Sequence, residues 1–129
     1  MYDIIVGVDT DAERAVAQAE AIAELPGGDE IRAILIHVFD DEDGDVESLG
    51  AINEARRILE EAGVEVETEG IVGDPAIAIL DSAERHDADC ICVAGRERSP
   101  AGKAIFGSVT QDVVIGAERP TLVCSAEGE

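Results

Sequence analysis

The chain has 129 residues, the size of one domain, and carries 30 acidic residues against nine basic ones, for a net charge of −21. So acidic a surface repels nucleic acid and anionic membranes, and we expect neither as a partner. No apolar run approaches the ~20 residues of a membrane-spanning helix, and no signal peptide begins the chain, so we expect a cytoplasmic protein.

The basic residues are unusual in kind, because eight of the nine are arginine and Lys103 is the single lysine. We interpret the acidic excess as adaptation to a salty cytoplasm. At molar salt the screening length falls to about 3 Å, so carboxylates cease to repel one another and keep the protein hydrated. An ordinary acidic protein of a low-salt cell is the alternative. The near absence of lysine favours the interpretation as a halophilic protein.

Strands and helices alternate along the chain. Apolar or alternating runs predict five strands, at residues 2–8, 31–38, 64–69, 89–94 and 121–125. Helical spacing of apolar residues and capping signals predict four helices, at residues 12–25, 49–62, 75–86 and 108–117. An acidic loop covers 39–47. This order predicts a single doubly wound α/β domain, a parallel sheet with helices on both faces.

Ligands of such sheets bind beyond the carboxyl ends of the strands, where the strand order reverses. Asp9 and Gly95 both follow predicted strand ends. They would flank the crevice if the first and fourth strands were neighbours.

The segment from Gly95 to Ser108 concentrates positive charge. Arg96, Arg98 and Lys103 fall within eight positions, with one acid among them. Glycines bracket the segment and a helix is predicted at its end. A glycine-rich, basic loop that leads into a helix N-terminus describes an anion site.

An ordered set of short motifs resembles the universal stress protein family over nearly the full length. The motifs are Val6-Gly-Val-Asp9, His37-Val38, Gly73-Asp74-Pro75-Ala76, Asp87-Ala-Asp89, Gly107-Ser108-Val109-Thr110 and Arg119-Pro120-Thr-Leu-Val. The resemblance implies one universal stress protein domain over residues 1–129, here a haloarchaeal-like member, with a five-stranded parallel sheet of order 3-2-1-4-5. It also implies dimers and, in one subgroup, binding of ATP or AMP, with Mg²⁺ if ATP is bound.

The nucleotide-binding subgroup has the pattern glycine, two residues, glycine, nine residues, then glycine followed by serine or threonine. Gly95 matches the first glycine, and Gly107 with Ser108 matches the last. Arg98 stands at the second glycine position, and the loop is one residue shorter. The arginine either blocks the usual backbone path or replaces lost backbone contacts with a charge-assisted phosphate contact.

The predicted phosphate site lies at the start of the last helix. Ser108 and the amides of Val109 and Thr110 would offer donors and the positive end of the helix dipole. Plain N-capping by Ser108 is the alternative.

The resemblance assigns the nucleoside end to three strand ends. Asp9 would contact the ribose or base, with capping of the following helix as its alternative. Val38 would bind the base through its backbone, and Ala94 with Gly95 would permit close approach. His37 is interpreted as a core or supporting residue.

Cys90, Cys92 and Cys124 without a secretion signal argue against a disulfide framework. We interpret Cys90 and Cys92 as small buried side chains of a strand; a redox or metal site is the weaker alternative.

No nucleophile with an adjacent base is apparent, so we expect a non-catalytic stress-response module that binds an adenine nucleotide, with at most slow ATP hydrolysis. A homodimer through residues 121–125 is expected, because that strand is apolar and lies at a sheet edge. The alternative is a family member that has lost nucleotide binding and acts as a dimeric interaction protein, whose basic loop binds an anion or a partner.

Overall fold

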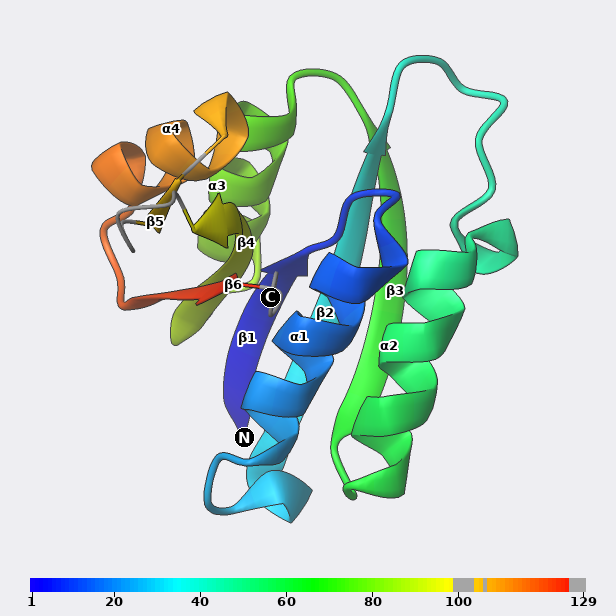
Figure 1. Ribbon diagram of the computed structural model, residues 1–129, viewed down its shortest axis with the longest axis vertical. Coiled ribbons are helices and arrows are strands. Elements are labelled where there is room, and N and C mark those ends of the chain that lie inside the picture. The colour runs from blue at the N-terminus through cyan, green and yellow to red at the C-terminus, as the bar shows by residue number, and fades with distance from the viewer. Residues whose placement is uncertain (99–103, 106, 126–129) are drawn as a thin grey trace.

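The computed structural model describes residues 1–98, 104–105 and 107–125, with side chains left out at 96–98 and 104–105 (Figure 1). The elements in chain order are β1 (Tyr2–Gly7), α1 (Ala12–Ala23), η1 (Gly28–Glu30), β2 (Ile31–Phe39), η2 (Val46–Ser48), α2 (Gly50–Glu61), β3 (Glu65–Val72), α3 (Pro75–Arg85), β4 (Cys90–Arg98), β5 (Ala104–Ile105), α4 (Ser108–Gly116) and β6 (Thr121–Ser125). Each predicted helix and strand is present, with ends shifted by a few residues. No helix in these ranges is long and apolar enough to cross a membrane.

Five parallel strands form the sheet in the order β3-β2-β1-β4-β6. This is the predicted order 3-2-1-4-5, and the fold prediction is confirmed. The first and fourth strands are neighbours, in register at Ile4 with Cys90 and Val6 with Cys92. The strand order therefore reverses between β1 and β4, and a crevice is expected at their carboxyl ends.

The segment after residue 94 differs from the prediction. The fourth strand was expected to end at Ala94, before a loop, but β4 continues to Arg98 and pairs antiparallel with the two-residue β5. The register joins Arg96 to Ile105 and Arg98 to Ala104. The physical reason is that the chain reverses direction here, and two extended arms satisfy each other's backbone N–H and C=O groups by pairing.

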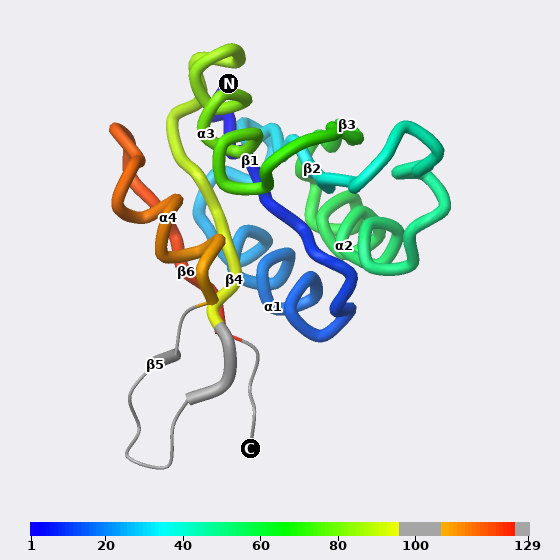
Figure 2. Tube along the Cα trace, turned by 90° about the horizontal axis from the view of Figure 1, so that it is seen from above, coloured from blue at the N-terminus to red at the C-terminus, as the bar shows by residue number. Residues whose placement is uncertain are grey.

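Helices α1 and α2 cover one face of the sheet, and α3 and α4 cover the other (Figures 1 and 2). Successive residues of a strand point to opposite faces, so Ile4 and Val6 pack beneath α1 and α2 while Ile5 packs beneath α3 and α4. Burial on both faces explains why the inner strands are continuous apolar runs rather than alternating ones.

Two helix ends follow the predicted capping chemistry. Asp74 caps α3 by accepting a hydrogen bond from the amide of Ile77 at 3.1 Å, and Pro75 takes the first helical position. Gly63 follows the end of α2 with a φ of 85°, which a residue with a Cβ rarely adopts.

Candidate functional site

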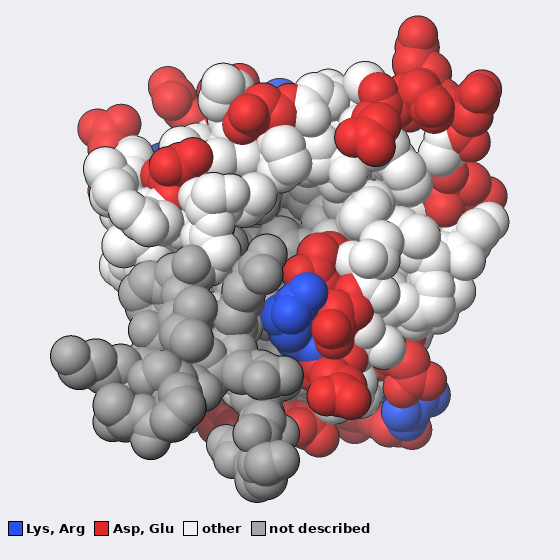
Figure 3. All heavy atoms as spheres, turned by 45° about the horizontal axis from the view of Figure 1, so that its top comes forward, with Lys and Arg blue, Asp and Glu red and all other residues white. Residues whose placement is uncertain are grey.

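A cavity of about 290 Å³ opens at the carboxyl ends of β1, β2 and β4, bounded by the first turns of α1, α3 and α4. Figure 3 looks onto this end of the molecule and shows the hollow at the centre of the face. The lining residues are Gly7, Val8, Asp9, Arg14, Ile36, His37, Val38, Pro75, Ile79, Val93, Ala94, Gly107, Ser108, Val109 and Thr110. The cavity therefore lies where the reversal of strand order places a crevice.

Seven of the nine predicted site residues line this cavity: Asp9, Val38, Ala94, Gly107, Ser108, Val109 and Thr110. Gly95 does not line it, because this residue is buried in β4 opposite Ser125. The side chain of Arg98 lies outside the described part of the structure, as does Lys103.

Helix α4 points its N-terminus at the cavity. The helix begins at Ser108, and its first intrahelical bond runs from the amide of Gln111 to the carbonyl of Gly107, at 3.0 Å. The amides of Ser108, Val109 and Thr110 consequently have no partner within the helix. Together with the helix dipole, these three donors make an anion-binding end.

Ser108 does not cap α4. Gly107 occupies the capping position, without a side-chain bond, and Ser108 is an exposed first residue of the helix. The capping alternative is therefore wrong, because the chain enters the helix one residue earlier than that role requires. Thr110 is buried, and its hydroxyl donates to the carbonyl of Ala94 at 2.6 Å, which ties the start of α4 to β4.

Asp9 carries a carboxylate held from two sides. Its Oδ1 accepts from the amide of Asp11 at 2.8 Å, and its Oδ2 accepts from Nε of Arg14 at 2.9 Å. The cap of α1 is Asp11, which accepts from the amide of Arg14 at 3.1 Å, so the capping alternative for Asp9 is also wrong. Since Asp9 stays half-exposed beside the cavity, its oriented oxygens keep lone pairs for a ligand.

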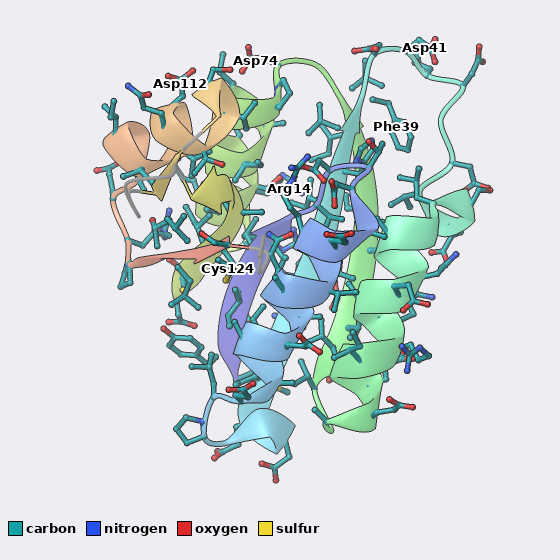
Figure 4. The ribbon with its side chains drawn as sticks, viewed as in Figure 1. Arg14, Phe39, Asp41, Asp74, Asp112 and Cys124 are labelled. Atoms are coloured by element: carbon teal, nitrogen blue, oxygen red, sulfur yellow. The ribbon has the colours of Figure 1, made fainter. Side chains whose placement is uncertain are left out.

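Arg14 is the functional candidate that sequence reasoning missed. It is the one cation among the cavity-lining residues that the structure describes, and its Nη1 also lies 3.6 Å from Asp11 Oδ2. In Figure 3 blue atoms lie against red ones at the rim of the hollow, and Figure 4 shows Arg14 on the first turn of α1. Its place in that turn, five residues after Asp9, is the one sequence signal for it, and that signal does not show what the side chain faces.

His37 lines the cavity and supports its wall. Its Nδ1 lies 2.7 Å from the carbonyl of Val8, and its ring meets Phe39 edge-on, with centroids 4.7 Å apart. Because a carbonyl only accepts, Nδ1 carries a proton in this contact. The amide of Val8 in turn donates to Ile36 at 2.8 Å, so the turn that carries Asp9 is fastened to β2.

The remaining wall is apolar and comes from α3 and the sheet. Ile79 and Pro75 of α3 line the cavity together with Val93 of β4 and Val38 of β2. Gly7 lets α3 approach closely, because a Cβ there would lie 2.6 Å from Cδ1 of Ile79. Pro75 was predicted as the first helix residue and as part of a family motif, and Ile79 only within the helix range, since nothing in their spacing reveals which helix turn meets a cavity.

The sequence model of the universal stress protein family matches residues 1–125. The chain belongs to the universal stress protein family. A universal stress protein from Archaeoglobus fulgidus has the same fold, with a TM-score of 0.80 and 30% identity over 96% of this chain and 98% of that one. A universal stress protein from the same organism, in complex with dAMP, gives a TM-score of 0.70 and 27% identity over the same shares.

A curated relative of this universal stress protein is the stress response protein NhaX of Bacillus subtilis (strain 168). The two are 35% identical over 72 residues, which make up 56% of this chain and 43% of NhaX. The match thus spans less than half the length of that relative.

Proposed function

We propose that this universal stress protein binds an adenine nucleotide in the cavity at the carboxyl ends of β1, β2 and β4, and acts as a non-catalytic stress-response module in the cytoplasm. The observation that carries the proposal is the convergence of a helix N-terminus, an oriented carboxylate and an apolar wall on one cavity. The dAMP complex of the Archaeoglobus fulgidus protein supports the class of ligand.

The phosphates would lie at the start of α4. The amides of Ser108, Val109 and Thr110 and the hydroxyl of Ser108 provide donors there, and no carboxylate lies in the first turn of α4. A helix N-terminus also favours negative charge through its dipole. This local preference opposes the repulsion that a chain of net charge −21 exerts on an anion.

The nucleoside would lie toward β1 and β2. The carboxylate of Asp9, fixed by Arg14, would accept a hydrogen bond from a ribose hydroxyl. The backbone of Val38 would meet the base, and Ile79 with Val93 would pack against it. Ala94 presents the smallest side chain that a residue with a Cβ allows, so the nucleotide could pass close to the end of β4.

A protein-held metal has no support in the described ranges, where no group of three or more His, Cys, Asp and Glu side chains could bind one. If ATP is the ligand, Mg²⁺ would accordingly be held through the nucleotide's phosphates and water, as this ion prefers.

Calorimetric titration of the folded protein with dAMP, AMP and ATP in molar salt tests the proposal. Ser108→Glu should abolish binding, because a carboxylate would occupy the phosphate end, while an acid in the first helical turn should leave α4 intact or stabilise it. Gln111→Glu is the matched control, since it adds the same charge to an exposed position of the same helix outside the cavity. Equal binding by both variants would refute the phosphate site.

We also propose a homodimer through β6. Among the described strands β6 pairs only with β4, and all five of its residues are half-buried, whereas Ile4 and Ile5 of the central strand β1 are fully buried. An edge strand of this kind offers unpaired backbone groups to a second copy. Sedimentation in molar salt should show a dimer, and a charged residue at Leu122 or Val123 should weaken it. A dimer that binds none of the three nucleotides would favour the interaction protein instead.

A further inference from the structure

Two thiols meet where β4 and β6 lie side by side. Sγ of Cys92 and Sγ of Cys124 are 3.6 Å apart. Cys92 is fully buried, whereas Cys124 is half-buried on the face of β6 that packs toward α1 (Figure 4). Cys90 lies on the same face of β4, but its thiol donates to the carbonyl of Ile91 at 3.6 Å.

The two thiols of the pair are chemically unequal. The hydrogen bond from Cys92 lowers the pKa of the Cys124 thiol, against the opposing effect of burial. That same bond, together with burial, raises the pKa of Cys92. Since the thiolate is the reactive form, the more accessible thiol, Cys124, is also the better nucleophile, whereas the buried Cys92 thiol keeps its proton more strongly.

We propose that Cys124 and Cys92 form a reversible thiol–disulfide switch that responds to hydroperoxides. The Cys124 thiolate attacks one oxygen of the peroxide, its O–O bond breaks, and the released alkoxide takes up the thiol proton as an alcohol or water. The Cys92 sulfur then displaces hydroxide from the resulting sulfenic acid, and its proton leaves with that hydroxide as water. Two thiols lose two electrons, and one peroxide is reduced.

The bond requires β6 to move. A disulfide has its sulfurs about 2.05 Å apart, which is closer than the thiols stand now. Cys92 lies opposite Leu122 and Cys124 lies opposite Ala94, so the cysteines are diagonal neighbours on the two strands. Oxidation therefore shifts the edge strand β6 relative to β4, beside Ala94, which lines the cavity. The switch does not depend on whether the cavity binds a nucleotide.

Mass spectrometry of the folded protein in molar salt tests the switch. After hydrogen peroxide and alkylation, one thiol should remain free, and the two oxidised cysteines should link the tryptic peptide 86–96 to the peptide that carries Cys124. Dithiothreitol should reverse the link.

Two alanine variants locate the bond. Cys124→Ala should abolish it, while Cys90→Ala, the matched control on the same face, should retain it with the same yield. Circular dichroism confirms that each variant is folded. The proposal is overturned by a bond between Cys90 and Cys92, by a link between two copies on a non-reducing gel, by sulfenic or sulfinic Cys124 without a disulfide, or by no reaction.

Discussion

The two ends of the sheet each carry an arginine–aspartate pair, but the pairs are built differently. At the amino end of the strands, Arg32 of β2 donates two hydrogen bonds to Asp3 of β1, from Nε to Oδ1 at 3.0 Å and from Nη2 to Oδ2 at 2.8 Å. At the carboxyl end, Arg14 reaches Asp9 through one nitrogen, at 2.9 Å. The Asp3 side chain is 12% exposed and that of Asp9 is 50% exposed.

The difference separates a structural pair from one that remains available to a ligand. Asp3 and Arg32 are in register on adjacent strands, so the sheet itself sets their distance, and the one guanidinium binds both carboxylate oxygens. Asp9 lies on a turn past the end of β1, where a helix begins and a cavity opens. The same two residue types thus form a structural ion pair at one end of the sheet and leave a half-exposed carboxylate beside a cavity at the other.

Withdrawal of salt should have the largest effect, because it removes the fold that supports both ends. At low ionic strength the 21 uncompensated negative charges repel one another over a longer screening distance and disfavour the compact state. Dilution from molar to millimolar salt should abolish most of the helical circular dichroism signal. An unchanged spectrum would contradict adaptation to high salt.

Replacing each aspartate in turn should show that the Asp3 pair contributes to stability and the Asp9 pair to nucleotide binding. Asp3→Ala should lower the free energy of unfolding by roughly 1–3 kcal/mol, because charge-assisted hydrogen bonds at a mostly buried site are lost. Asp9→Ala, at a half-exposed site, should change it by no more than about 0.5 kcal/mol but weaken nucleotide binding. Denaturant titration at fixed molar salt measures the first effect. Equal destabilisation by the two variants would remove the distinction.

Arg14 should contribute to affinity rather than to stability. Arg14→Gln should weaken binding of dAMP about tenfold, or ~1.4 kcal/mol, because the Asp9 carboxylate loses its orientation and the cavity loses a cation. Arg57→Gln is the matched control, since Arg57 pairs with Glu54 and Glu61 on the exposed face of α2. If calorimetry gives the two variants the same affinity, Arg14 has no role beyond net charge.

A third arginine–carboxylate pair, Arg56 with Glu47, should give the smallest effect on stability when it is removed. The Thr68 hydroxyl, at 2.7 Å, and then Arg56 lower the pKa of Glu47 below its ordinary value of 4.5. A depressed pKa in the folded state adds stability above the ordinary value, and this stability disappears as the pH falls through the folded value. Glu47→Gln should therefore flatten the pH dependence of unfolding below about pH 4.5. An unchanged slope would show that the interaction is screened at this exposed site.

Seven of the fifteen cavity-lining residues were predicted, because they follow or begin elements that are themselves locally encoded. Asp9 follows an apolar run, and Ser108 opens a helix after a glycine. Arg14 was missed because a helix's first turn does not reveal what its outer side chains face. The pairing of Cys92 with Cys124 was missed for a similar reason, since 32 residues separate them and the strand register brings them together.

The sequence by itself determined the order of elements, the capping of α3 by Asp74 and the charge, because hydrophobic period, turn residues and composition act over short stretches of chain. The family resemblance predicted strand order 3-2-1-4-5. In the tertiary structure this order buries both faces of the inner strands. Only the tertiary structure decided that Arg14 holds Asp9 beside a cavity, that β4 extends to Arg98, and that two thiols meet on neighbouring strands. These features depend on distances between segments far apart in the chain, and packing of the helices against the sheet fixes those distances.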